Sequence, residues 1–196
     1  IKIINKFRKK KTKIIYFSSI HVYENYNNSK SLTNSLLNSR SYYSVRNMVC
    51  EKLITKNFNQ NEVQAVVIRI ANIFGIPNNL KKYSKSMNNL AINVFCNKII
   101  KNQKIQIKSN YLEKRNYVSV NDFIDFIKTS FIEKKINLSS IINYTSKKQV
   151  NMRQLVNVLK IQSKKLNLRN PKINFQNRVK KTNINYSFDT RELIKF

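Results

Sequence analysis

Two short apolar runs in the first half of the chain, over residues 13–18 and 64–70, have the pattern of strands buried on both faces. Both are rich in Ile, Val or aromatic residues, as is typical of strands inside a parallel sheet. Between them, apolar residues recur at helical spacing over 42–58, which predicts a helix with one buried stripe. The order strand, helix, strand predicts right-handed parallel crossovers and therefore the α/β fold class.

The second half of the chain predicts further alternating elements. Its apolar patterns predict helices over 90–100, 121–131, 151–159 and 188–193, and strands over 104–107 and 140–144. Asn121 and Asn151 are expected to cap their helices, because a short polar side chain accepts a hydrogen bond from the first turn. Stretches rich in Asn, Ser and Lys over 25–40 and 78–86 predict loops.

Polar residues directly follow both strands. The first run ends at Ser18 and Ser19, and the second is followed by Asn72 and Gly75. Ligands of open α/β sheets bind beyond the carboxyl ends of the strands, so polar side chains there are good candidates for a site. A serine pair after a strand is also a common loop feature, and only neighbouring motifs distinguish the two interpretations.

The composition limits how much of a nucleotide-binding fold the chain can form. It has 196 residues, 41% of them hydrophobic, which is enough for a core, but it contains only one glycine. A complete nucleotide-binding fold needs glycines at its first strand–helix turn, where the backbone approaches a pyrophosphate. The chain also begins at Ile1 rather than Met, so we expect it to be the C-terminal part of a longer protein.

The formal net charge of +29 raises nucleic acid as a partner. The lysines are spread over the whole chain, however, together with an excess of Asn and Ile, which indicates compositional drift and nonspecific adhesion rather than a dedicated site. We expect no specific nucleic-acid binding. A basic polyanion- or RNA-binding module remains the alternative, and it would need exposed rings such as Tyr117, Phe123 and Phe126 on one basic face.

The two cysteines, Cys50 and Cys96, fall in apolar helical patterns, and no segment resembles a secretory signal. A reducing, cytoplasmic location is therefore expected. No apolar run approaches the ~20 residues needed to cross a membrane. We expect no metal site.

Three segments in fixed order carry a family resemblance. They are Phe-Ser-Ser-Ile-His-Val-Tyr over 17–23, Tyr-Ser-Val-Arg-Asn-Met-Val-Cys-Glu over 43–51 and Arg-Ile-Ala-Asn-Ile-Phe-Gly over 69–75. Together they resemble the NAD-dependent epimerase/dehydratase family of extended short-chain dehydrogenases/reductases. The resemblance implies the C-terminal part of a Rossmann-like, doubly wound parallel sheet over 1–78, and a small α/β substrate-binding lobe over 79–196 with interleaved returns to the sheet.

The resemblance also implies catalytic roles. In the family a tyrosine exchanges a proton with the substrate, a serine or threonine orients the reacting hydroxyl, and a lysine four residues after the tyrosine lowers the phenol pKa from about 10 and binds the cofactor ribose. Tyr43 and Ser19 match the first two, and Glu51 matches a family glutamate. Asn47 stands at the lysine position and can donate a hydrogen bond but carries no charge. Arg46 is rotated from it by about 100° and is expected to point off the site.

Other interpretations of these residues stay open. Pairing Tyr42 with Arg46 keeps a cation at spacing four but loses the match to Glu51. Tyr43 could instead be a half-buried aromatic side chain where a loop meets a helix. His21 stands where some dehydratases of the family place an acid, although a solvent-facing turn histidine is the favoured interpretation.

Three further residues resemble the substrate-binding positions of the family. Asn72 corresponds to an asparagine that reaches the substrate phosphate or sugar. Arg115, followed by Asn116 where the family usually has Asp, and Arg178 correspond to arginines that hold the nucleotide diphosphate. Arginine suits this role because its planar group binds two phosphate oxygens at once.

We therefore expect a fragment or degenerate member of the family that acts on a nucleotide-diphosphate sugar in carbohydrate biosynthesis. NAD or NADP is the expected cofactor, Tyr43 and Asn47 are the cofactor-binding residues, and this chain alone is not expected to bind the cofactor without a glycine-rich loop. The resemblance also implies a homodimer. A catalytically inactive remnant is the alternative, because Asn47 replaces the family lysine.

Overall fold

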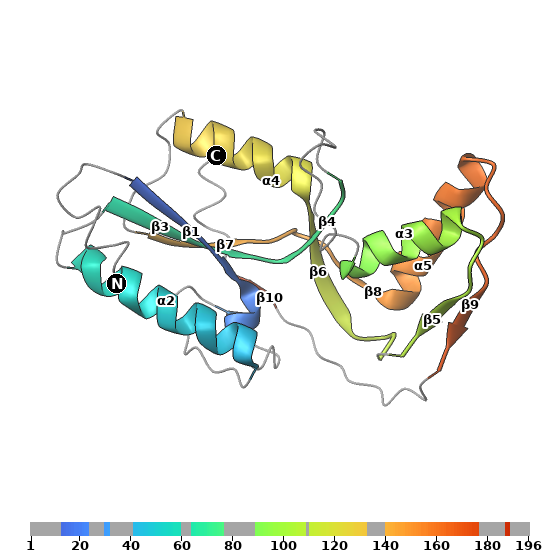
Figure 1. Cartoon of the computed structure of the whole chain (residues 1–196), viewed down its shortest axis with the longest axis horizontal. Helices are drawn as coiled ribbons and strands as arrows, with labels where there is room; N and C mark the ends of the chain where they lie inside the picture. The colour runs from blue at the N-terminus through green and yellow to red at the C-terminus, as the bar shows by residue number, and fades with distance from the viewer. Residues whose placement is uncertain are drawn as a thin grey trace. The chain divides into compact units, whose positions relative to one another are not determined.

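The computed structural model describes residues 13–23, 30–31, 41–59, 64–76, 89–108, 110–132, 140–176 and 187–188. Contacts divide the chain into two compact units (Figure 1). Unit 1 comprises Ile1–Ala71, Asp125–Thr145 and Asn185–Phe196, and unit 2 comprises Asn72–Ile124 and Ser146–Ile184. The predicted boundary at residue 78 stays a prediction for the family's two lobes.

Unit 1 is built on a parallel sheet in the order β1 (Lys13–Ser19), β3 (Gln64–Ile70) and β7 (Ser140–Tyr144). The central strand β3 pairs along its whole length with β1, from Lys13 opposite Gln64 to Ser19 opposite Ile70. A short 3₁₀ turn, η1 (Ile20–Val22), follows β1. β2 (Lys30–Ser31) pairs in parallel with β10 (Ser187–Phe188).

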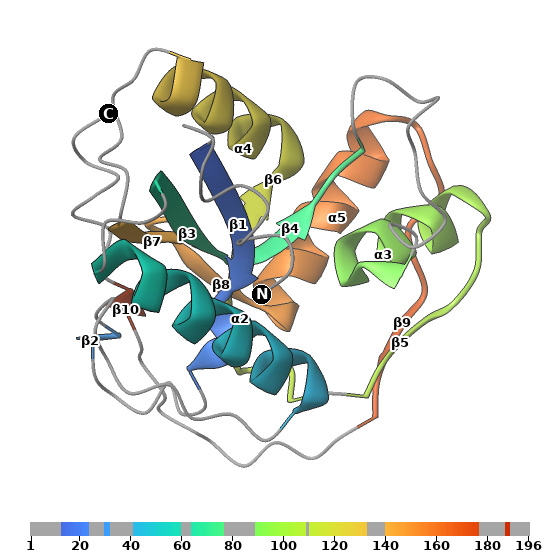
Figure 2. The ribbon, with the colours of Figure 1, turned by 60° about the vertical axis from the view of Figure 1, so that its left-hand side comes forward.

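One long helix, α2 (Tyr42–Asn59), lies alongside this sheet (Figures 1 and 2). Successive residues of a strand point to opposite faces, so Ala65 and Val67 of β3 share the face that packs against Ile54 of α2. Both β3 residues are fully buried. Apolar packing therefore places α2 against the sheet, and the polar contacts described below fix its rotation.

Unit 2 combines two small sheets with two helices. Its elements are β4 (Asn72–Phe74), α3 (Ala91–Ile100), β5 (Ile105–Ile107), β6 (Lys114–Ser119), β8 (Gln149–Asn151), α5 (Met152–Lys165) and β9 (Ile173–Phe175). β6 pairs in parallel with β4 and antiparallel with β8, and β5 pairs in parallel with β9. The core of this unit is apolar and comprises Ile92, Ile99, Ile105, Ile107, Met152, Leu155, Val156 and Leu159.

The chain passes from one unit to the other through α4 (Val120–Ile127), which a π-helical turn, η4 (Lys128–Ile132), continues. In unit 1 the ring of Phe126 packs on that of Tyr144, with centroids 4.6 Å apart. Ala71 donates its backbone N–H to the carbonyl of Tyr144 at 3.0 Å. Within unit 1, these contacts hold the end of β7 against α4 and against Ala71, the residue that follows β3.

The structure confirms the α/β class, because its strands pair mostly in parallel and alternate with helices. The predicted strands over 13–18 and 64–70 and the helices over 42–58 and 90–100 are present within one residue at each end. Asn151 caps α5 as predicted, in a reciprocal capping box with Gln154. The sequence patterns did not indicate the short strands β4, β6, β8 and β9.

Two predictions about local structure are corrected. Asn121 does not cap α4, since the helix begins at Val120 and the hydroxyl of Ser119 accepts the N–H of Asn121 at 3.2 Å. Phe188 lies in a strand rather than in the predicted terminal helix, and the rest of that helix lies outside the described residues. The loop over 78–86, and the loop over 25–40 apart from β2, also lie outside them.

Candidate active site

The first turn of α2 is fixed by a serine at its N-terminus. The Ser41 hydroxyl oxygen accepts the backbone N–H of Ser44 at 3.1 Å, and the Ser41 carbonyl accepts the N–H of Val45 at 2.9 Å. A side-chain oxygen at this place satisfies one of the free N–H groups of a helix start. Tyr43 is therefore held in a capped first turn, with half of its side chain exposed.

One turn later, Asn47 is buried against the sheet. It is 3% exposed, and its Oδ1 accepts the hydroxyl proton of Tyr16 on β1 at 2.8 Å. Burial raises the pKa of Tyr16, and the neighbouring Cys50 and Glu51 raise it further, so the phenol stays protonated as a donor. Among the described residues, Asn47 Nδ2 is buried without a hydrogen-bond partner.

A second turn later, Glu51 forms a buried ion pair with Arg69 of β3. Both side chains are 2% exposed, and Nη2 of Arg69 lies 2.7 Å from Oε2 of Glu51. Nε of Arg69 donates to both carboxylate oxygens at 3.1 Å, and the hydroxyl of Ser18 donates to Oε1. Burial lowers the pKa of Arg69, but the hydrogen bonds and the charge of Glu51 outweigh it, so the pKa rises.

Tyr23 completes this buried network at the carboxyl end of the sheet. Its hydroxyl donates to Oδ1 of Asn143 on β7 at 2.9 Å and accepts Nη1–H of Arg69. The guanidinium carbon of Arg69 lies 4.9 Å from the centre of the Tyr23 ring. Burial raises the pKa of Tyr23, and Arg69 only partly opposes it. The Arg69 guanidinium on β3 therefore connects the side chains of this network, which come from β1, α2, β7 and the residue after η1.

These contacts determine which face of α2 meets the sheet. Tyr43, Asn47 and Glu51 are spaced by four, so they lie on one helix face. The two later residues bind β1 and β3, and α2 also packs against η1, the turn that follows Ser19. Ser19 is 5% exposed at the end of β1, and its hydroxyl oxygen accepts the N–H of His21 at 3.2 Å.

The direction of Arg46 on α2 differs from the sequence-based prediction. Arg46 does not point away from Tyr43, since its guanidinium carbon lies 5.6 Å from the centre of the Tyr43 ring. The reason is that Arg46 is three residues after Tyr43, which places both on the same side of the helix. Tyr42 is 85% exposed, so the alternative pairing with Arg46 lies off the sheet-facing side. His21 is exposed in the η1 turn.

The predicted substrate residues of unit 2 lie on its central sheet. Asn72 starts β4, and its Nδ2 donates to the carbonyl of Asn116 at 2.9 Å. Arg115 on β6 is 30% exposed and pairs with Glu113 at 3.6 Å. Asn116 is 1% exposed and makes two 2.7 Å hydrogen bonds with the backbone of Ser146. Arg178 lies outside the described residues.

The predicted residues are divided between the two units. Ser19, Tyr43 and Asn47 belong to unit 1, and Asn72 and Arg115 belong to unit 2. The sequence interpretation named Ser18 beside Ser19 as a candidate, but it missed two partners in this buried network, Tyr16 and Asn143. An arginine inside the apolar run over 64–70 was the available signal, because a buried charge requires a partner.

The rings named for the nucleic-acid alternative are largely covered. Phe123 is buried, and Tyr117 and Phe126 are half-buried. This argues against their use as a stacking platform for bases. In the part of the chain that the structure describes, no helix is both long and apolar enough to span a bilayer. The same residues contain no group of three His, Cys, Asp or Glu side chains suited to a metal ion.

A model of the NAD dependent epimerase/dehydratase family matches residues 1–143. The chain belongs to this family. Its sequence matches no curated protein. The family match includes the segments that carry Ser19, Tyr43, Asn47, Asn72 and Arg115, so these residues fall within the region that defines membership.

Solved structures show the same fold. UDP-glucuronic acid 4-epimerase from Bacillus cereus, in complex with UDP-glucuronic acid and NAD, is 18% identical with a TM-score of 0.73, and the match covers 95% of this chain and 56% of that one. UDP-glucose 4-epimerase from Thermotoga maritima, with UDP-glucose, is 16% identical with a TM-score of 0.71 over 96% and 58% of the two chains.

A related dehydratase gives the same result. dTDP-glucose 4,6-dehydratase from Bacillus anthracis, in complex with NAD, is 14% identical with a TM-score of 0.72 over 97% of this chain and 57% of that one. This chain therefore spans a little more than half the length of each of these three proteins.

Proposed function

We propose that this chain supplies the proton-transfer segment and the substrate lobe of an NAD-dependent enzyme that epimerises or dehydrates a nucleotide-diphosphate sugar. The observation that carries the proposal is the fixed rotation of α2. Asn47 and Glu51 hold its Tyr43 face against the sheet, beside the turn that follows Ser19. Family membership supports the same assignment.

In this proposal, Tyr43 exchanges the proton of the reacting sugar hydroxyl, and Ser19 orients that hydroxyl by a hydrogen bond. A bound NAD would supply the hydride acceptor for the adjacent carbon, and Tyr43 and Asn47 are the residues that would hold it. Arg46 places a positive charge beside Tyr43, on the helix turn where Asn47 supplies none. General acid–base catalysis of this kind contributes roughly 10²–10⁴-fold.

Asn47 fits a cofactor hydroxyl at this position. Its Nδ2 is buried and unpartnered among the described residues, so it offers a donor to a ribose oxygen while Tyr16 holds the other side of the amide. An unsatisfied buried donor costs about 1–3 kcal/mol, which an acceptor on the cofactor would recover. With a single glycine, the chain has no glycine-rich loop for the pyrophosphate, so tight cofactor binding requires residues beyond these 196.

In unit 2, we assign the nucleotide diphosphate to Arg115 and Arg178 and the sugar or phosphate to Asn72. Arg115 is partly exposed, and its ion pair with Glu113 is long at 3.6 Å, so its guanidinium is available for a phosphate. Asn72 already donates to a backbone carbonyl, so it would offer its side-chain oxygen. A cytoplasmic homodimer in carbohydrate biosynthesis is the setting that we propose for this activity.

A noncatalytic binding protein is the second candidate. The observation that favours it is Asn47, which supplies no charge to Tyr43 and is already bound to Tyr16. Such a protein would bind the nucleotide sugar without turning it over.

The test is turnover of UDP-sugars by the chain extended upstream through any glycine-rich loop that its gene encodes, with products followed by NMR. We expect Tyr43→Phe to lower turnover by about 10²-fold or more and Asn47→Lys to raise it. Tyr42→Phe is the matched control, because it removes the same hydroxyl from the adjacent, exposed residue. Equal rates for the two tyrosine variants, together with no gain from Asn47→Lys, would exclude this pair as the proton-transfer group.

A further inference from the structure

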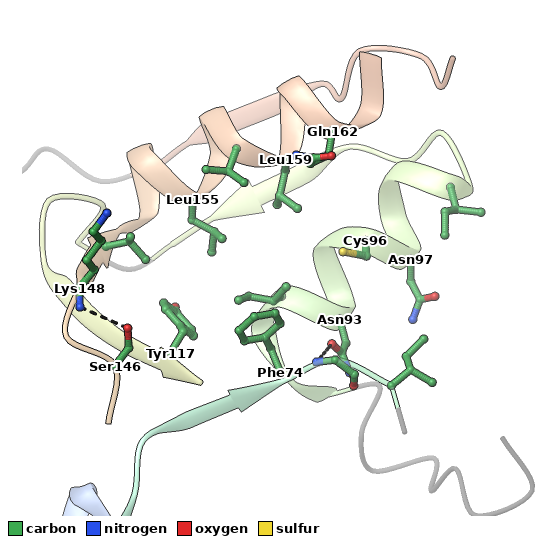
Figure 3. A pocket seen from close by; sticks show the side chains of 16 residues that line it. Phe74, Asn93, Cys96, Asn97, Tyr117, Ser146, Lys148, Leu155, Leu159 and Gln162 are labelled. Atoms are coloured by element: carbon green, nitrogen blue, oxygen red, sulfur yellow. Dashed lines mark hydrogen bonds between the residues drawn. The ribbon is translucent and has the colours of Figure 1, made fainter. Parts of the chain in front are cut away.

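Unit 2 contains a cavity of about 570 Å³ between α3, α5 and the strands β4, β6 and β8 (Figure 3). Small-molecule sites are typically ~300–1,000 Å³ with mostly apolar walls and a few polar groups. The cavity has this character, with walls that include Phe74, Ile92, Cys96, Tyr117, Leu155 and Leu159. Asn72 and Arg115, the described residues proposed to hold a nucleotide sugar, do not line it.

The two helices present apolar stripes to this cavity. On α5 the lining residues are Leu155, Val158, Leu159 and Gln162, at the spacing of a single helix face. Val158 is 49% exposed, and Ile100 on α3 is 68% exposed, although both line the cavity. Apolar surface left in water at a concave site favours an occupant with an apolar body, because covering that surface releases its hydration water.

The charge at the cavity has one sign. Among the described residues that line it, Lys148 is the only charged one, and Figure 3 shows it beside Ser146 and Tyr117. Lys148 is exposed, and the ion pairs found among the described residues do not include it. The site therefore offers an ammonium group to an anion and has no carboxylate for a cation.

We propose that this cavity binds an amphiphilic carboxylate, with its alkyl chain between α3 and α5 and its carboxylate at Lys148. The volume of about 570 Å³ lies within the usual range of ligand sites and leaves room for an alkyl chain of roughly ten carbons. The apolar walls select the chain, and the rim cation selects the charge of the head group.

Calorimetric titration of the 196-residue chain with decanoate, octanoate and decylammonium tests both selections. Each methylene buried should tighten binding roughly fourfold, so decanoate should bind about tenfold or more tighter than octanoate. Decylammonium should bind at least about tenfold more weakly than decanoate, because it meets Lys148 with like charge. Equal affinity for octanoate and decanoate would indicate adhesion to the basic surface and overturn the proposal, as would the absence of decanoate binding.

Matched variants locate the site. Val158→Trp fills the cavity and should abolish decanoate binding, whereas Asn157→Trp adds the same ring at the adjacent exposed residue outside it and should not. Lys148→Glu should weaken binding roughly two- to tenfold, whereas Lys160→Glu makes the same charge change outside the cavity and should leave the affinity unchanged. If both members of either pair behave alike, the carboxylate does not occupy this cavity.

The two cysteines give an independent readout. Cys96 lines the cavity and Cys50 lies on α2 in unit 1, and both are free and partly buried. Decanoate at saturation should slow the alkylation of Cys96 by N-ethylmaleimide, followed by peptide mass spectrometry, and leave Cys50 unchanged. Equal protection of both thiols, or protection of neither, would overturn the proposal.

Discussion

Buried polar side chains hold the carboxyl end of the unit 1 sheet, whereas apolar side chains dominate the helix pair of unit 2. In unit 1, Glu51, Arg69 and Tyr23 are buried, and hydrogen bonds from Ser18 and to Asn143 complete their polar contacts. In unit 2, α3 and α5 meet across an apolar cavity with exposed Val158 and Ile100 at its walls.

The two kinds of contact constrain the structure to different degrees. A buried ion pair contributes little net stability, but it tolerates few geometries, so it fixes the rotation of α2 against the sheet. Apolar walls allow many arrangements and recognise only the apolar area and shape of an occupant. The two regions should therefore respond differently to substitution.

Breaking the ion pair of unit 1 should have the largest effect on stability. Arg69→Met leaves the Glu51 carboxylate buried without its cation, and we expect the free energy of unfolding to fall by about 3–5 kcal/mol. Urea unfolding followed by circular dichroism measures this loss. The double variant Glu51→Leu with Arg69→Met should recover most of it, because no charge remains buried. A double variant as unstable as Arg69→Met alone would contradict this account of the network.

The buried amide of unit 2 gives the next largest effect. Asn116→Asp restores the residue type that the family usually has, yet it removes the donor that binds the carbonyl of Ser146. We expect a loss of about 1–3 kcal/mol in the free energy of unfolding, since a buried carbonyl loses its partner and a carboxylate faces it. An Asp variant as stable as the parent would show that Ser146 does not need this donor.

The cap of α5 should contribute less. Asn151→Ala removes the side chain that accepts the N–H of Gln154 at 2.8 Å, and we expect a loss of about 1 kcal/mol. Gln154→Ala keeps that acceptor and removes only the reciprocal bond, so its effect on the urea midpoint should be smaller. The reverse order of the two variants would show that the Gln154 side chain dominates the capping box.

The smallest effect concerns the pH dependence of the cavity thiol. Burial raises the pKa of Cys96 above its ordinary value of 9.0, so its reactive thiolate should form only at higher pH than that of an exposed thiol. The rate of Cys96 alkylation by iodoacetamide should therefore reach its plateau at a higher pH than the rate of free N-acetylcysteine does. A rate profile that coincides with N-acetylcysteine would mean that the thiol is not desolvated.

Much of unit 1 could be predicted from the sequence, and less of unit 2. Its two long strands and α2 carry strong apolar patterns. The assignment of Ser19, Tyr43 and Asn47 to a site rests on the family resemblance and stays a prediction. The strands β4, β8 and β9 of unit 2 have three residues each, too few for a pattern to register. The Tyr16–Asn47 bond and the position of Arg46 over Tyr43 also escaped prediction, because they depend on helix rotation and rotamers that sequence spacing does not fix.

The central claim is that this chain provides half of an NAD-dependent nucleotide-sugar site. Calorimetric titration with NAD, with and without a UDP-sugar, tests it most directly, on the 196 residues and on the chain extended upstream through any glycine-rich loop its gene encodes. The account predicts NAD binding only in the extended protein, and tighter binding when the UDP-sugar is present. No binding of either ligand by a folded, extended protein would contradict it.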